Sequence, residues 1–222
     1  MKILVINGSP KSVRSDTLHV TRAFLDGMGE NAEFIDTIKS KINPCLGCFH
    51  CWNKTPGRCV QHDDMDAIFA KYLQADLVIW STPLYCYGLP SNCKALMDRL
   101  LPLNSPAMYI DSEGHTHHKT TVDHFPATLL ICGCGFPETQ NNCEGLRFQF
   151  RRMFTDRAQM FFCVESPLLG LPGTDEVTGP YLELVRLAGR EYASAGKLSA
   201  ATVEALEKPM YPPELYRQGS QK

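Results

Sequence analysis

Short apolar runs alternate with longer amphipathic stretches along the 222 residues of this chain. The first run, residues 2–7, is continuously apolar between its polar ends, which is typical of a parallel strand covered on both faces. Similar runs follow at regular distances. Together they predict five strands, at residues 2–7, 32–37, 76–81, 125–132 and 159–165.

The stretches between and after these runs carry apolar residues at helical spacing. The clearest case is residues 63–74, with Asp63 as a capping residue and one apolar face formed by Met65, Ile68, Phe69 and Tyr72. Further helices are predicted at residues 16–29, 90–101, 141–154 and 181–192. Five strands alternating with five helices predict one α/β domain, a doubly wound five-stranded parallel sheet with helices on both faces.

Two long segments interrupt this alternation. Residues 38–62 hold four cysteines, and residues 104–124 hold His115, His117 and His118. Long excursions in a compact domain are usually functional or disordered. Beyond the predicted sheet domain of residues 1–195, residues 196–222 predict a short helix and a proline-rich arm.

Composition and charge narrow the classes of function. Hydrophobic residues make up 44% of the chain and charged residues 21%, enough to bury one sizeable core. The net charge of −2 and the absence of a long basic run argue against binding to nucleic acid or to an anionic membrane. The apolar start covers only residues 3–6, too short for a signal peptide or a membrane span, and predicts a cytoplasmic protein. Cytoplasmic thiols stay reduced, so the ten cysteines are expected to be free, metal-bound or redox-active.

The loop after the first strand is the first place to expect a ligand, because doubly wound sheets bind ligands outside the carboxyl ends of their strands. It reads NGSPKSVRSDT and has neither the glycine pattern of a dinucleotide fingerprint nor that of a nucleotide-triphosphate loop. Its hydroxyls lead into a helix start, whose N–H groups and dipole favour one phosphate, and Lys11 and Arg14 are placed to offset the charge. An ordinary capped and solvated loop would use the same residues, so the loop alone leaves both interpretations open.

This loop resembles the phosphate loop of the flavodoxin-like NADPH-dependent FMN reductase family, in which Gly-Ser-Pro is followed by a short stretch and Gly-Asn-Thr. Here Ser15-Asp16-Thr17 replaces Gly-Asn-Thr, and the backbone N–H of Asp16 remains available to a phosphate. The resemblance extends over roughly residues 1–195. It implies a flavodoxin-like fold and FMN contacts at Ser9, Lys11, Ser15, Asp16, Thr17 and Leu18.

Two further segments resemble the same family. Residues 81–99, STPLYCYGLPSNCKALMDR, resemble its second flavin segment, a Thr-Pro-x-Tyr turn followed by a helix with Lys-x-x-x-Asp-Arg. Residues 131–138, ICGCGFPE, supply glycines that allow the backbone to approach a flavin closely. Aromatic side chains at strand ends also fill cores, but three such loops at one sheet edge are more specific than one. The implied ring contacts are Pro83, Leu84, Tyr85, Cys86, Tyr87, Gly88, Gly133, Cys134 and Gly135.

Four cysteines in residues 38–62 have the spacing C-x2-C-x2-C-x7-C: Cys45, Cys48, Cys51 and Cys59. Three thiolates on so short a loop can bind a four-iron cubane, with the fourth arriving from a short excursion. Zinc fits less well, because structural zinc usually pairs two C-x2-C knuckles across a longer gap. The pattern resembles the cysteine motif of iron-sulfur flavoproteins, in which a [4Fe-4S] cluster passes electrons to FMN. A metal-free thiol loop, held by packing of Phe49 and Trp52, is an equally open alternative.

The remaining cysteines and the histidines are assigned less specific roles. Cys93, Cys143 and Cys163 are expected to be small buried apolar residues, whereas Cys86, Cys132 and Cys134 would lie near the flavin. The three histidines are expected on an exposed polar loop, with metal binding as the less favoured alternative.

The resemblance implies an FMN-dependent oxidoreductase. NAD(P)H would be the electron donor, and a quinone, another small oxidant or an electron carrier would be the acceptor. Since the flavin performs the redox chemistry, no catalytic acid or base is assigned. Two alternatives stay open: a flavodoxin-like electron-transfer or FMN-sensing protein without nicotinamide chemistry, and a zinc protein without flavin. The resemblance also implies a homodimer or homotetramer in which residues 104–124 or the C-terminal arm of a neighbour cover the flavin.

Overall fold

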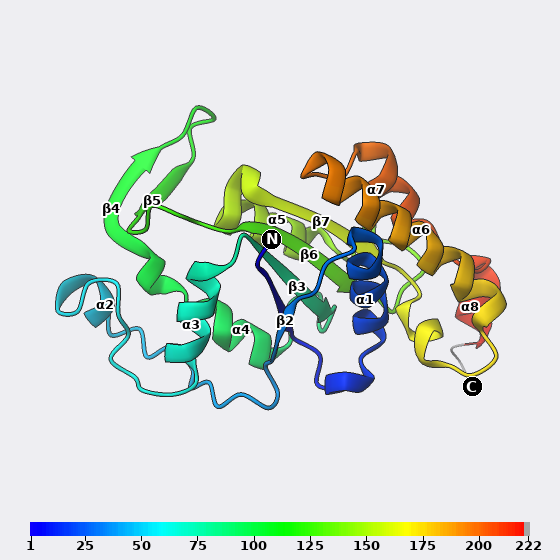
Figure 1. Cartoon of the computed structure of the whole chain (residues 1–222), viewed down its shortest axis with the longest axis horizontal. Helices are drawn as coiled ribbons and strands as arrows, with labels where there is room; N and C mark the ends of the chain where they lie inside the picture. The colour runs from blue at the N-terminus through cyan, green and yellow to red at the C-terminus, as the bar shows by residue number, and fades with distance from the viewer. Residues whose placement is uncertain (220–222) are drawn as a thin grey trace.

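The five apolar runs form one parallel sheet, with the strand order β2-β1-β3-β6-β7, in a computed structural model that describes residues 1–219. The strands are shorter than or close to the predicted runs: β1 Ile3–Asn7, β2 Glu33–Asp36, β3 Leu77–Pro83, β6 Ala127–Gly133 and β7 Ala158–Cys163. This is the order of flavodoxin-like doubly wound sheets, in which the chain changes direction between β1 and β3. The predicted fold class is confirmed (Figure 1).

Both faces of the sheet are buried, which explains the continuous apolar runs. In β1, Leu4 and Ile6 belong to one core cluster, and Ile3 and Val5 belong to the other. Because successive strand residues point to opposite faces, each strand must be apolar at every position to serve both clusters.

Helices complete the two layers. One face is covered by α1 (Asp16–Met28) and α6 (Asp175–Ala195), and the other by α3 (Met65–Gln74), α4 (Ser91–Asp98) and α5 (Glu144–Phe154). Figure 1 shows α1 and α6 to the right of the sheet and α3 and α4 to its left. α5 begins later than its predicted start because Asn141 has a left-handed φ of 64°. α6 is longer than predicted, since its first turns are polar and gave no apolar signal.

Helices α1 and α6 lie against each other at two glycines. A Cβ at Gly27 would overlap the backbone carbonyl of Arg186, and a Cβ at Gly189 would overlap that of Phe24. Only glycine leaves the backbones room to approach this closely, so these two positions set the distance between the helices.

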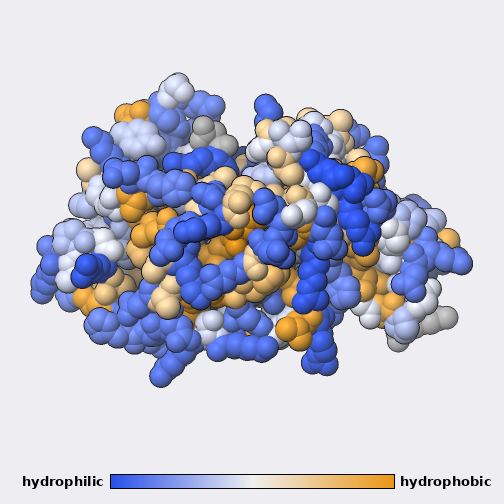
Figure 2. Space-filling model, viewed as in Figure 1, coloured by the Kyte–Doolittle hydropathy of each residue, from blue (hydrophilic) through white to orange (hydrophobic). Residues whose placement is uncertain are grey.

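Residues 104–120 correct one prediction. They form an antiparallel hairpin of β4 (Asn104–Ile110) and β5 (Thr116–Thr120), not an irregular loop. The hairpin projects away from the sheet at the upper left of Figure 1. It carries an apolar patch among hydrophilic residues (Figure 2), and Met108, Tyr109 and Ile110 are exposed on it. Its strands lie outside the core, so they lack the buried pattern by which the other strands were predicted.

The C-terminal residues contain two helices, α7 (Ala200–Leu206) and α8 (Pro213–Gly219). Leu206 is fully buried in the core cluster that α1 and α6 share, so the predicted short helix packs on the domain. The predicted arm therefore includes a second helix, and its last residues, 220–222, lie outside the described part of the chain. Within residues 1–219, no helix has the length and apolar character needed to cross a membrane.

Candidate functional site

A cavity of about 200 Å³ lies at the carboxyl ends of β1, β3 and β6, next to the point where the strand order changes direction. All three predicted flavin segments contribute to its lining. The predicted residues in the lining are Ser9, Lys11, Ser15, Asp16, Thr17, Pro83, Leu84, Tyr85, Gly133 and Gly135. The structure thus brings together, at one edge, three segments that are far apart in the sequence.

The loop after β1 is held by the last residue of that strand. Asn7 Oδ1 accepts the backbone N–H of Ser9 at 3.2 Å, and Asn7 Nδ2 donates to the carbonyl of Ser12 at 3.1 Å. Ser15 then caps α1, its Oγ accepting the N–H of Leu18 at 3.3 Å. The result is a short, fixed loop that leads the first N–H groups of α1 to the cavity, the usual place for a phosphate in such folds.

The acidic residue of this loop is neutralised locally. Lys11 Nζ lies 2.6 Å from Asp16 Oδ2, so the two charges that line the cavity are paired with each other. The Asp16 carboxylate packs against Gly170, where any side chain would overlap it. Donors for a phosphate are therefore the hydroxyls and N–H groups, while Arg14 does not line the cavity and Lys11 is already partnered.

A tight turn after β3 forms the rim of the cavity. Tyr85 and Gly88 exchange two backbone hydrogen bonds of 3.0 and 2.9 Å, and between them Cys86 and Tyr87 adopt left-handed φ values of 49° and 61°. Two non-glycine residues held in this region cost energy, and such strain is concentrated at functional sites. Of the predicted contacts, Cys86, Tyr87 and Gly88 form this turn and do not line the cavity.

A flat aromatic surface adjoins the turn. The Tyr87 ring stacks on Phe136 with centroids 6.0 Å apart and planes inclined by 7°, and both side chains are exposed. Phe136 was not predicted as a site residue, although it lies in the quoted third segment. Exposed parallel rings beside a cavity provide apolar contact for a planar ligand or for another protein surface.

The strand ends behind the cavity are packed closely. A Cβ at Gly133 would overlap Thr17 Oγ1 and would lie 2.9 Å from Ser166 Oγ, so this position requires glycine. Leu18 and Cys134, both predicted contacts, are buried and do not line the cavity. They support the loops from within the core.

The loop after β7 also belongs to the site, although no sequence motif predicted it. Ser166 and Pro167 line the cavity, and the preceding Glu165 is fully buried. Glu165 Oε2 accepts the backbone N–H groups of Met210 and Tyr211, each at 2.8 Å, and its burial raises the pKa of the carboxyl above its ordinary value. The available signal was positional, because this loop leaves the same sheet edge as the other three.

The four predicted metal ligands also come together. Cys45, Cys48, Cys51 and Cys59 line one small cavity with Arg99. The left-handed φ of 61° at Gly47 turns its N–H toward Cys45 Sγ, at 3.5 Å. Cys51 lies on the short helix α2 (His50–Asn53), where burial and the neighbouring thiols raise its pKa. Four thiols placed together in this way are readily deprotonated only with a compensating positive charge such as a metal.

Both ends of the cysteine segment are fastened to the end of α4. Arg99 binds Asp63 through two hydrogen bonds of 2.8 and 3.1 Å, with its Nη1 also donating to the carbonyl of Asn43 at 2.9 Å. Asp63 Oδ2 in turn accepts the N–H of Asn43 at 2.9 Å. The predicted capping role of Asp63 is thus incomplete: α3 begins at Met65, whose N–H it accepts at 3.0 Å, but its main partner is Arg99.

The four thiols do not form a close group of the kind that holds a single ion. A tetrahedral zinc with bonds of about 2.3 Å to sulfur requires sulfurs about 3.8 Å apart. No three of these sulfurs lie within 4.8 Å of one another in residues 1–219. In addition, Arg99 Nε is buried without a hydrogen-bond partner among the described residues, beside a cavity lined by thiols that, as thiolates, would accept a hydrogen bond from it.

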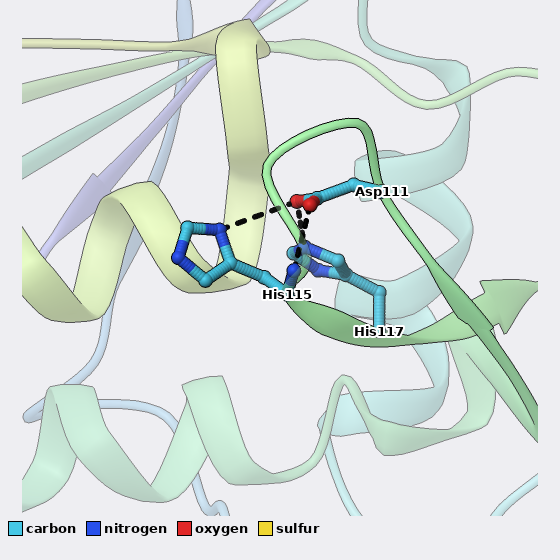
Figure 3. A group of neighbouring side chains, drawn as sticks. All are labelled: Asp111, His115 and His117. Atoms are coloured by element: carbon cyan, nitrogen blue, oxygen red, sulfur yellow. Dashed lines mark hydrogen bonds and ion pairs between the residues drawn. The ribbon is translucent and has the colours of Figure 1, made fainter.

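The histidines of the hairpin do not act together. His115 and His117 gather around Asp111, with His117 Nε2 at 2.8 Å and His115 Nδ1 at 3.4 Å from its Oδ2 (Figure 3). Backbone N–H donation from His115 and the His117 ring lower the pKa of Asp111 to about 2. His118 instead lies with its ring centroid 4.8 Å from that of Trp52.

The guanidinium group of Arg152 contacts this histidine cluster. Arg152 Nη1 lies 3.3 Å from His117 Nε2, the same nitrogen that faces the carboxylate, and Arg152 Nη2 donates to the carbonyl of Thr116 at 2.9 Å. A metal cation there would be repelled by the guanidinium, so the arrangement is better explained as a hydrogen-bonded network that joins the hairpin to α5.

The sequence comparison identifies the family. A profile of the NADPH-dependent FMN reductase family matches residues 1–129, which is more than half of the chain. The chain belongs to this family. The match covers β1 to the start of β6, and with them the first two predicted flavin segments of this FMN reductase family member.

Individual relatives agree with this assignment. An iron-sulfur flavoprotein of Methanocaldococcus jannaschii is 39% identical over 105 residues, 46% of this chain and 53% of that protein. One of Archaeoglobus fulgidus is 36% identical over 141 residues, 62% of this chain and 58% of that protein. The chain thus matches little more than half the length of these curated relatives.

A solved structure shows a similar fold. The FMN-dependent NADH-azoreductase of Bacillus anthracis, in complex with FMN, has a TM-score of 0.62 at 18% identity, and the match covers 87% of this chain and 100% of that chain.

Proposed function

We propose that this protein is an FMN-dependent oxidoreductase that takes electrons from NAD(P)H and passes them to a small molecule, such as a quinone, or to an electron carrier. The observation that carries the proposal is the meeting of three family-like segments around one cavity at the point where the strand order changes direction. Membership of the FMN reductase family supports it.

The residues of the cavity fit FMN. Ser9, Ser15 and Thr17 place three hydroxyls beside the start of α1, and together with its N–H groups they would bind the phosphate. The Gly133 backbone approaches closely because no side chain intervenes, and it would lie along the ring with Leu84. When bound, FMN supplies both one-electron and two-electron redox chemistry. The chain's own part is to hold it, exclude water from one face and leave the other open beside Tyr87.

We further propose that the four thiols bind a [4Fe-4S] cluster. Support comes from the names of the relatives and from the common cavity of the thiols. The thiol cavity and the flavin cavity have no lining residue in common. They are joined by α4, which begins after the turn at Tyr85–Gly88 and ends beside the thiols, a span of about 12 Å.

Cofactor content tests this proposal on one anaerobic preparation. We expect about one FMN per chain together with about four iron and four acid-labile sulfide, as one cubane requires. Flavin without iron would favour the metal-free thiol loop and leave the oxidoreductase proposal intact. Stoichiometric zinc without flavin would contradict both and favour a zinc protein. FMN that neither NADPH nor NADH reduces would favour an electron-transfer or FMN-sensing protein.

A further inference from the structure

Arg99 directly follows α4 as its C-cap, and it is buried with its ion-pair partner. The side chains of Arg99 and Asp63 are 1% and 0% exposed. A guanidinium has five N–H protons, so full burial requires several acceptors. Two groups near it supply them, the Asp63 carboxylate and the carbonyl of Asn43.

One N–H donor of this guanidinium has no hydrogen-bond acceptor among the described residues. Nη1 and Nη2 have partners, but Nε is buried with none among residues 1–219. A buried donor without an acceptor is unfavourable, so native structures rarely keep one without a further partner such as a water, an ion or a ligand. The unpaired Nε therefore points to an acceptor that becomes effective when the site is loaded.

The thiol of Cys59 is the acceptor at hand. It already lies within hydrogen-bonding and electrostatic range of the Arg99 guanidinium, and both residues line the small cavity formed by the four thiols. A thiolate is a far better acceptor than a thiol, and a metal keeps cysteine in its thiolate form. Cys59 is also the ligand that arrives from the far end of the segment, only four residues before Asp63.

We propose that Arg99 Nε donates a hydrogen bond to the Cys59 sulfur of the loaded site and thereby raises the reduction potential of the cluster. The inference rests on the proposed [4Fe-4S] site. One-electron reduction transfers an electron from the reductant to the cluster, moves no atom and adds one negative charge. A donor aimed at a ligand sulfur stabilises the more negative state, and hydrogen bonds to sulfur are a recognised determinant of such potentials.

The sharpest variant is Arg99→Lys. Lysine keeps the positive charge for Asp63 but has no Nε–H at this position, so it removes the donor to Cys59 with the least change to the ion pair. The matched control is Arg58→Gln, which removes a charge next to Cys59 in sequence but on an exposed side chain, where solvent screens it. The midpoint potential of the cluster is measured by anaerobic dithionite titration followed by electron paramagnetic resonance.

We expect the reduced-to-oxidised ratio of the Arg99→Lys cluster to fall on the order of tenfold at a fixed potential, equivalent to about 59 mV for one electron. The Arg58→Gln cluster should keep the wild-type midpoint. An unchanged midpoint in Arg99→Lys, or an equal shift in Arg58→Gln, overturns the inference.

If the Arg99→Lys protein does not retain the cluster, a second variant tests the same inference. Asp63→Asn combined with Arg99→Gln replaces the buried ion pair by two neutral amides, which leaves no uncompensated buried charge. This double variant should also lower the midpoint, and an unchanged value contradicts the inference. Wild-type protein that binds FMN but contains no iron or sulfide would instead show that the proposed cluster is wrong.

Discussion

Gly133 is the residue at which the flavin site is most sensitive to a single methyl group. Its missing side chain leaves the space next to Thr17 Oγ1 and Ser166 Oγ, at the end of β6. We expect Gly133→Ala to reduce FMN affinity at least tenfold, because either the β6 backbone or the phosphate loop must shift. Gly179→Ala is the control for an added methyl group, since Gly179 is exposed on α6, does not line the cavity and has open space around a Cβ. Equal FMN affinity in the two variants, measured by flavin fluorescence, would contradict the assigned cavity.

The hydroxyls of the phosphate loop give a second prediction. Ser9→Ala and Thr17→Ala should each weaken FMN binding about tenfold to a hundredfold, because each removes one charge-assisted hydrogen bond worth about 1.5–3 kcal/mol. Ser12→Ala controls for the loop itself: Ser12 does not line the cavity, and its Oγ donates to Asp36. The same loss in all three variants, measured by equilibrium dialysis of FMN, would place the phosphate elsewhere.

Single site residues could be predicted from the sequence where their type and position agree with a family motif. Ser9, Thr17 and Gly133 are such residues, and all three line the cavity. Sequence reasoning missed Phe136 and Ser166, because an isolated aromatic or hydroxyl residue after a strand carries no motif of its own. Their roles depend on which strands are neighbours, and that becomes known only from the sheet order.

The contact between α1 and α6 is the element-scale feature that depends most on glycine. We expect Gly189→Ala to lower the free energy of unfolding by about 1–3 kcal/mol, because the added Cβ would overlap the Phe24 carbonyl. Gly179→Ala, in the same helix, has open space around its Cβ, and the gain in helix propensity is opposed by Pro180 directly after it, so stability should change by less than about 1 kcal/mol. Urea unfolding of both variants checks this, and destabilisation of similar size in both would show that the helix contact is looser than described.

The arm that carries α7 and α8 is fastened to the site by Glu165, and this gives a pH prediction. Burial raises the pKa of Glu165 in the folded protein above the ordinary 4.5, so the folded state binds the proton more tightly than the unfolded chain. Its contribution to stability is therefore complete below pH 4.5 and is lost as the pH rises through the raised folded value.

Glu165→Gln removes this titration while keeping an acceptor for the Met210 and Tyr211 N–H groups. We expect the free energy of unfolding of wild type, relative to this variant, to fall as the pH rises above 4.5 through the raised folded pKa. Parallel stability curves for the two proteins would mean that Glu165 keeps its ordinary pKa.

Elements were predictable where burial imposes a pattern. All five sheet strands and the helices over them follow from apolar periodicity, because each must fill a core. The hairpin of β4 and β5 was missed because its residues are largely exposed, and α8 because it has no buried residue. Neither element has a core contact from which periodicity would arise.

On the scale of the whole molecule, the strand order decides which loops meet. The sequence predicted a doubly wound sheet, and a resemblance to one family supplied the flavodoxin-like order that the structure confirms. The fastening of both ends of the cysteine segment by Arg99 and Asp63 was beyond prediction, since the two residues are 36 positions apart. The homodimer or homotetramer, with residues 104–124 or the arm covering the flavin of a neighbour, stays a prediction.

Anaerobic stopped-flow mixing of the FMN-loaded protein with NADPH, and separately with NADH, tests the central claim most directly. The flavin absorbance band should bleach with at least one of the two nicotinamides, at a rate that rises with nicotinamide concentration until binding saturates. The Gly133→Ala protein, which is expected to retain little FMN, should show little bleaching per chain. A fully loaded protein whose flavin is bleached by dithionite but by neither nicotinamide would contradict the account.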